Sequence, residues 1–155
     1  MVNHQDPYDT LIFMVRCPDN YQASRTYPVQ LCLSGGNQSE KVVNYCYAAW
    51  FRSTYFKNYI SILPLAPKGE NLRYYSAKYI LQIINTIRKN YKTTSGNWIL
   101  CGTSNGGAAS FNFAAASPKL YEGIIAMPGI LSQSIKPTID WTHLKVLISY
   151  GEKEN

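Results

Sequence analysis

The fold is decided by the stretch Trp98-Ile99-Leu100-Cys101-Gly102-Thr103-Ser104-Asn105-Gly106-Gly107. It begins as a short apolar run, passes through Gly-x-Ser-x-Gly and continues into an alanine-rich segment with no helix breaker before Pro118. This order predicts a buried strand, a sharp turn with Ser104 at its apex, and a helix. Gly102 and Gly106 suit such a turn because side chains there would collide with the opposing backbone. The pattern is that of a nucleophile elbow, although so short a motif also occurs by chance in unrelated chains.

Length and composition predict a single domain. With 155 residues, of which 46% are hydrophobic, the chain can bury one core and is too short for two ordinary domains, so residues 1–155 are expected to form one unit. It contains no run of about 18 apolar residues, so no membrane span is expected. Residues 1–7 are polar and do not resemble a leader, although a leader removed beforehand would leave the same picture.

The formal charge of +6 does not by itself indicate nucleic-acid binding. The tight basic group is Arg88, Lys89 and Lys92, which lies where a predicted helix ends and where cations complement the helix dipole. The 13 tyrosines lie within or beside apolar segments and are expected to pack half-buried. Nucleic acid is therefore not an expected partner.

The cysteines are Cys17, Cys32, Cys46 and Cys101, with no Cys-x-x-Cys pair and no histidine at ligand spacing. Neither a metal nor another cofactor is expected from this pattern. Cys32 and Cys101 fall inside predicted core strands, where cysteine behaves as a small hydrophobic residue. Buried free thiols favour a reducing compartment such as the cytoplasm.

Apolar strand-like runs alternate with helical runs. The clearest helical run, residues 74–91, has an apolar stripe at i, i+3, i+4, i+7 and i+10, formed by Ala77, Ile80, Leu81, Ile84 and Ile87. A second helix is expected from an N-cap at Ser39 to about Arg52, and residues 93–97 are expected to form a turn before the elbow strand. Nearly continuous apolar strands alternating with helices predict a mainly parallel sheet in a three-layer α/β/α sandwich. The predicted strands are residues 10–15, 29–33, 59–63, 98–101, 123–127 and 145–150.

Functional sites in such sheets lie at the carboxyl ends of the strands. Residues 64–73, which contain two prolines and a glycine, are a candidate substrate entrance because of that position. The loops expected at this edge are residues 34–39, 66–71, 103–107, 128–136 and 151–155.

Three ordered segments carry a resemblance to a known family: Tyr27-Pro28-Val29-Gln30-Leu31-Cys32-Leu33-Ser34-Gly35-Gly36, then Gly102-Thr103-Ser104-Asn105-Gly106-Gly107, then Val146-Leu147-Ile148-Ser149-Tyr150-Gly151-Glu152-Lys153-Glu154. Together they resemble the α/β-hydrolase superfamily. They look closest to the phospholipase/carboxylesterase and polyhydroxybutyrate-depolymerase-like esterases. The resemblance runs from about residue 10 to the last residue, and the elbow is its most specific part.

The resemblance implies that Ser104 is the nucleophile. It further implies that the backbone N–H of Asn105 is one oxyanion donor and that the loop Gly35-Gly36-Asn37 supplies the other. Taken alone, Gly35-Gly36 would equally suit a plain tight turn. The chain departs from the family at Ser34, which precedes these glycines. The usual pair in the family is His-Gly, and this chain has Ser34-Gly35.

The other two members of a catalytic triad are less well marked. The family position for the acid falls on Glu154, with Glu152 as the competitor, while both carboxylates would also suit solvated charges at a chain end. The family order places a histidine after the acid, and none follows here. His4 and His143 are expected to be surface or packing residues, with His143 at the opposite end of the sheet. The chain is therefore interpreted as a C-terminally truncated fragment.

The activity implied for the complete protein is that of a serine hydrolase acting on small carboxylic esters through an acyl-enzyme on Ser104. The fragment alone is expected to be nearly inactive. A non-catalytic binding module with a relic elbow and a peptidase of the same fold are the alternatives. The residues assign neither the acyl and alcohol groups nor the oligomeric state.

Overall fold

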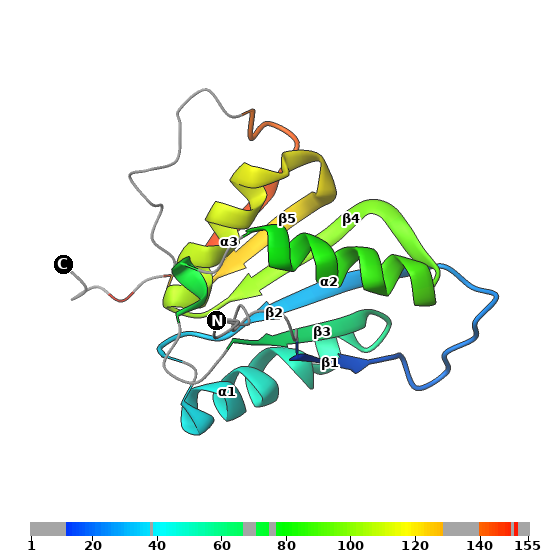
Figure 1. The fold of residues 1–155 in the computed structure, drawn as a ribbon, viewed down its shortest axis with the longest axis horizontal. Coiled ribbons are helices and arrows are strands. Elements are labelled where there is room, and N and C mark those ends of the chain that lie inside the picture. The colour runs from blue at the N-terminus through cyan, green and yellow to red at the C-terminus, as the bar shows by residue number, and fades with distance from the viewer. Residues whose placement is uncertain are drawn as a thin grey trace, which may run out of the picture.

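The computed structural model of the protein describes residues 12–37, 39–66, 71–74, 77–128, 140–149 and 151. Its strands are β1 (Ile12–Arg16), β2 (Tyr27–Leu33), β3 (Ile60–Leu65), β4 (Thr93–Gly102), β5 (Tyr121–Ala126) and β6 (Lys145–Ile148). They form one six-stranded sheet in the order β1-β3-β2-β4-β5-β6 (Figure 1). β1 runs antiparallel to β3, and the other neighbouring pairs are parallel. The mainly parallel sheet predicted from the sequence is confirmed.

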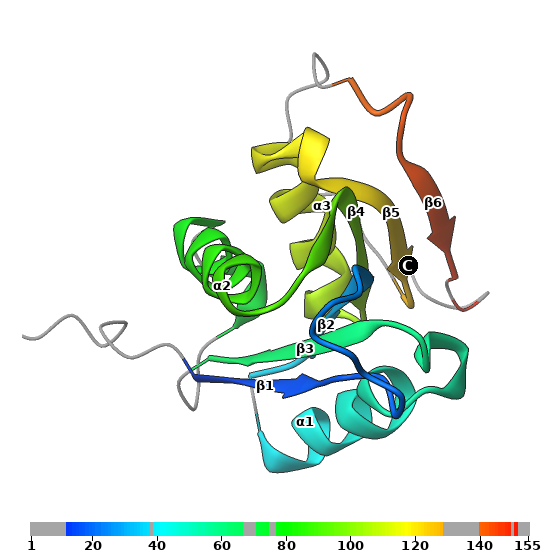
Figure 2. The ribbon, with the colours of Figure 1, turned by 90° about the vertical axis from the view of Figure 1, so that its right-hand side faces the viewer.

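Helices lie on both faces of this sheet (Figure 2). One face carries α1 (Glu40–Cys46), which continues directly into a π-helix, η1 (Tyr47–Phe51). The other face carries α2 (Ala77–Asn90) and α3 (Asn105–Ala116). This is the predicted three-layer α/β/α arrangement. Three single turns of 3-10 helix complete the described elements: η2 (Thr54–Phe56), η3 (Leu72–Tyr74) and η4 (Pro118–Leu120).

The alternation of side chains along β2 divides the core into two clusters. Val29, Leu31 and Leu33 are buried in the larger cluster, which also contains the apolar residues of α2 and α3. Cys32 points to the opposite face and packs with residues of α1 and η1. Both faces of β2 are covered, and from Val29 to Leu33 the strand is apolar except for Gln30.

The apolar stripe predicted for the helix at 74–91 is present in α2. Ile80, Ile84 and Ile87 are buried, and so is Ile83, which the predicted stripe did not include. The helix is shorter than predicted, because it begins at Ala77 and ends at Asn90. At the start of the predicted span, Tyr74 is the last residue of η3, and residues 75 and 76 lie outside the described residues.

The prediction of a turn at residues 93–97 is wrong in one respect, because β4 already begins at Thr93. Thr93 pairs with Tyr27, and Trp98 pairs with Val29, so the residues between them lie opposite Pro28 alone. Proline has no N–H to donate to a strand partner, and the extra residues form a bulge at this point. The turn-like composition of 93–97 thus marks a bulged strand start.

The second predicted helix also differs from expectation. Ser39 lies at the N-cap position of α1, but its side chain makes no capping hydrogen bond. Its carbonyl instead accepts hydrogen bonds from the N–H groups of Val42 and Val43, both at 3.0 Å. The second half of the predicted helix is π-helical, which the sequence pattern does not reveal.

None of the helices in the described parts of the chain is both long enough and apolar enough to cross a lipid bilayer.

Candidate functional site

Ser104 lies at the apex of a sharp turn between β4 and α3, at the carboxyl end of the sheet. Its backbone has φ 54° and ψ −119°, and it is the one non-glycine residue with positive φ among the described residues. Such a conformation costs about 1–3 kcal/mol and persists only where the surroundings fix it. The side chain is exposed. The turn therefore presents the Ser104 hydroxyl to solvent beside the first turn of α3, whose dipole favours negative charge.

The turn is possible because of glycines at positions where a Cβ has no room. A Cβ on Gly102 would overlap the carbonyl of Gly106, and a Cβ on Gly106 would overlap the carbonyl of Leu33 at the end of β2. The start of α3 thus packs directly on the ends of β2 and β4. The strand-turn-helix context required of an elbow is present.

The loop after β2 approaches the same turn. A Cβ on Gly35 would lie 2.6 Å from the carbonyl oxygen of Thr103 and 3.1 Å from the Cβ of Ser104. Gly36 has φ +57°, and Asn37 is exposed in the turn that follows. Asn105 is the first residue of α3, where backbone N–H groups lack partners within the helix. The structure thus brings Gly35 and the start of α3 together around Ser104.

The departure from the family at Ser34 leaves this loop close to the elbow. Ser34 is fully buried, and a Cβ on Gly106 would lie 2.7 Å from its carbonyl oxygen. Ser34 therefore lies directly against the start of α3.

Two further contacts to the elbow come from Pro128, in a loop that the sequence placed at the same edge, and from Trp50, which the sequence did not connect with the elbow. The N–H of Ser104 donates to the carbonyl of Pro128 at 3.1 Å, just after β5. The indole N–H of Trp50 in η1 donates to the Thr103 hydroxyl at 2.9 Å. Trp50 fits an apolar helix pattern, and no local signal pairs it with a residue 53 positions away. The bond from Trp50 becomes visible only in three dimensions.

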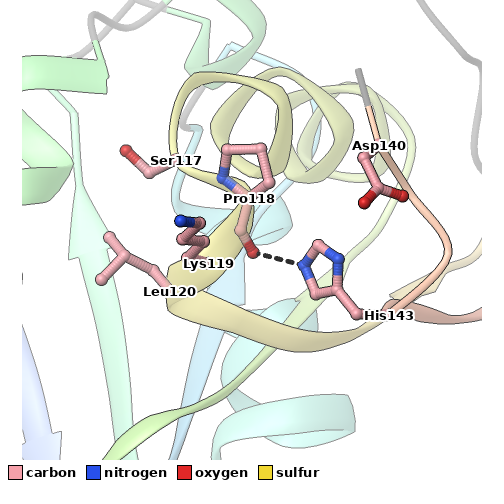
Figure 3. Close-up of a pocket in the computed structure, with 6 residues that line it drawn as sticks. All are labelled: Ser117, Pro118, Lys119, Leu120, Asp140 and His143. Carbon is pink, nitrogen blue, oxygen red and sulfur yellow. Dashed lines mark hydrogen bonds between the residues drawn. The ribbon is translucent and has the colours of Figure 1, made fainter. Parts of the chain in front are cut away.

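Neither the candidate acids nor the two histidines lie at Ser104 within the described residues. Glu152, Glu154 and His4 lie outside them. His143 lies just before β6, at the amino end of the sheet, as predicted. It is exposed, and its Nε2 lies 2.8 Å from the carbonyl oxygen of Pro118 (Figure 3).

His143 borders a hollow of about 610 Å³ at this opposite end. Asp140 borders it as well, and hydrogen bonds from the hydroxyl and N–H of Thr142 lower the pKa of its carboxyl. The other described lining residues are Ser117, Pro118, Lys119 and Leu120. The hollow is separate from the elbow because it lies where β5 and β6 begin and not where they end.

The buried cysteines behave as apolar core residues. Cys32 and Cys101 are adjacent in the β2–β4 ladder, and both are fully buried, as is Cys46. All three are free thiols, which confirms the prediction for Cys32 and Cys101. Burial raises the pKa of Cys46 to about 12 and, against a hydrogen bond with Gln30, that of Cys101 to about 12. Within the described ranges, no three His, Cys, Asp or Glu side chains gather as metal ligands would.

Solved structures resemble this chain at low sequence identity. A thermostable esterase has a TM-score of 0.56 at 17% identity, over 76% of this chain and 37% of its own. Acetyl xylan esterase from Aspergillus awamori has a TM-score of 0.61 at 15% identity, over 84% of this chain and 53% of its own. A candidate dipeptidyl aminopeptidase IV from Bacteroides ovatus has a TM-score of 0.59 at 16% identity, over 79% and 22%. No family model and no curated protein matches the chain.

The chain has the α/β-hydrolase fold. The fold implied by the sequence resemblance is thereby confirmed. This chain spans between 22% and 53% of the length of these α/β-hydrolase-fold structures. At such low identity the likeness is one of fold, and the chemistry has to be argued from the elbow itself.

Proposed function

We propose that the protein is a serine hydrolase that cleaves carboxylic esters, with Ser104 as its nucleophile. The observation that carries the proposal is the backbone of Ser104, held at positive φ between β4 and α3 with its side chain exposed. A strained conformation of this kind at the carboxyl end of a sheet is typical of a site built for chemistry. The esterases among the similar structures support esters as the substrate class.

In the proposed reaction the Ser104 oxygen attacks the ester carbonyl and forms a tetrahedral intermediate. The N–H of Asn105 and the backbone of the Gly35-Gly36-Asn37 loop would donate hydrogen bonds to its oxyanion. Collapse of the intermediate expels the alcohol and leaves an acyl group on Ser104, which water then removes. A histidine would carry the proton in both steps, oriented by a carboxylate for which Glu154 and Glu152 are the candidates.

Hydrolysis by the natural full-length protein tests this proposal. We expect cleavage of p-nitrophenyl acetate to fall about a thousandfold or more in Ser104→Ala, because the residues of a triad act as a unit. Ser117→Ala, at the far end of α3, is the matched control and should leave the rate unchanged. Undiminished hydrolysis in Ser104→Ala would contradict the proposal.

Parallel assays separate the alternatives. Cleavage of a peptide p-nitroanilide in preference to the ester would identify a peptidase that uses the same serine. A wild-type protein that cleaves neither substrate would favour a binding module with an inactive elbow.

A further inference from the structure

We infer that Trp50 is a positioning residue for Ser104, acting through a hydrogen bond to Thr103. The inference rests on the proposed function, because it assigns a role relative to the Ser104 nucleophile. The indole N–H of Trp50 donates to the Thr103 hydroxyl at 2.9 Å, and Thr103 is the residue immediately before the apex of the elbow.

Thr103 is held from three directions. Its N–H donates to the carbonyl of Leu33 in β2 at 3.2 Å, and its carbonyl accepts from the N–H of Gly106 in α3 at 2.9 Å. The hydrogen bond from Trp50 also fixes the Thr103 side chain. Trp50 belongs to η1, which lies on the opposite face of the sheet from α3. Because Ser104 has a costly positive φ, its direction depends on how firmly the neighbouring residues are fixed. A displacement of about 1 Å at the reacting oxygen is enough to slow an enzyme strongly.

Trp50 is itself held by a chain of hydrogen bonds that runs from strand to strand along the sheet. Its carbonyl accepts from the Gln30 amide at 3.3 Å, and the Gln30 oxygen accepts from the Ser61 hydroxyl at 3.0 Å. The Ser61 hydroxyl in turn accepts from the Arg16 guanidinium at 3.1 Å. Gln30 and Ser61 are fully buried, where polar groups are costly unless they are paired. The chain of hydrogen bonds thus runs from β1 through β3, β2 and η1 to the elbow.

The π-helical winding of η1 determines where Trp50 points. The N–H of Arg52 donates to the carbonyl of Tyr47 at 2.9 Å, the five-residue spacing of a π-helix. This winding has more residues in each turn than the preceding α1, so it directs the side chain of Trp50 differently from a continued α-helix. Single π-turns of this kind occur frequently at functional sites.

Acylation of Ser104 in the natural full-length protein tests the inference. Trp50→Phe keeps an aromatic ring and removes the N–H, while Thr103→Val keeps the shape and removes the acceptor. Each should lower the acylation rate constant for p-nitrophenyl acetate, measured from the pre-steady-state burst of p-nitrophenol, about tenfold with the dissociation constant of the substrate unchanged, as expected for one lost hydrogen bond. The double variant should be no slower than the slower single variant, because both remove the same bond.

Two comparisons isolate the bond from general packing. Thr103→Ser restores a hydroxyl at the same position and should recover most of the rate lost in Thr103→Val. Trp141→Phe makes the same chemical change at a half-buried tryptophan against Phe111, and should acylate at the wild-type rate. If Trp50→Phe does not fold, the Thr103→Val and Thr103→Ser pair decides the question.

Three results would overturn the inference alone: wild-type acylation rate constants in both Trp50→Phe and Thr103→Val, a change confined to the dissociation constant of the substrate, or a lower Tm with no change in acylation. The first denies any role for the bond, the second makes Trp50 a substrate contact, and the third makes the bond purely structural. A wild-type protein that is not acylated at Ser104 would overturn the proposed function as well.

Discussion

The conformation of Ser104 depends on glycines that other elements of the fold press against. Gly106 lies against the end of β2, Gly102 lies against the start of α3, and Gly35 lies against Thr103. Each of these glycines lacks a side chain at a point where two backbone segments meet. At the scale of single residues, the elbow is therefore a packing arrangement that leaves one serine exposed.

Replacing Gly106 tests this arrangement. In Gly106→Ala the new Cβ overlaps the carbonyl of Leu33, so α3 must move away from β2. We predict a loss of about 3 kcal/mol in the free energy of unfolding, measured by urea denaturation. In the control Gly123→Ala the nearest atom, the carbonyl oxygen of Lys145, is 3.2 Å away, and the loss should be smaller. Equal stability of the two variants would show that the elbow is loosely packed.

The buried thiols predict a loss of stability in alkaline solution. Unfolded thiols ionise near pH about 8.5, whereas burial raises the pKa of Cys46 and Cys101 to about 12 in the folded chain. Their stabilisation is therefore complete below pH about 8.5 and is lost as the pH rises toward about 12. Urea denaturation at pH values between about 8.5 and 10, below the pKa of most tyrosines and lysines, should show that the free energy of unfolding declines as the pH rises.

The variant Cys46→Ala isolates one of these thiols. Its free energy of unfolding should fall less steeply with pH than that of the wild type, whatever its absolute value. A slope equal to that of the wild type would mean that Cys46 ionises alike in the folded and unfolded chain.

At the scale of elements, α2 is held to the sheet by its apolar stripe. Ile83, Ile84 and Ile87 are each 1% exposed, while the opposite side of the helix is open to solvent. We predict that Ile84→Ala lowers the free energy of unfolding by about 3 kcal/mol, because it leaves a cavity in the larger apolar cluster. Gln82→Ala, on the exposed side, should change it by less than about 0.5 kcal/mol. Similar losses in both variants would mean that α2 does not contribute to the core through this stripe.

Periodicity was enough to predict α2 and the parallel strands, because burial alone selects the residues there. It was not enough where backbone pairing decides the structure. The bulge at the start of β4 lies opposite Pro28 on the neighbouring strand, and the π-helical η1 contains Trp50, which bonds to Gln30 and Thr103. Such features depend on partners far away in the sequence, so a local pattern cannot reveal them.

At the scale of the whole molecule, the site is assembled at one edge of the sheet from separate segments. Ser104 and Gly35 were predictable because glycine-rich loops after apolar strands carry a recognisable pattern. The loop that begins at Pro128 was also expected at this edge, whereas the contact of Trp50 with the elbow was not predictable, because it uses an ordinary residue type. The separation of His143 from the elbow was predictable, because it precedes a strand and so lies at the amino end of the sheet.

The measurement that tests the central claim most directly is covalent labelling of the natural full-length protein with a fluorophosphonate, followed by mass spectrometry of tryptic peptides. Trypsin should release residues 93–119 as one peptide, which contains Ser104 together with Ser95, Ser110 and Ser117. We predict a single adduct on this peptide, placed on Ser104 by fragment ions and absent from Ser104→Ala. An unlabelled protein, or an adduct on another serine, would contradict the assignment of Ser104 as the nucleophile.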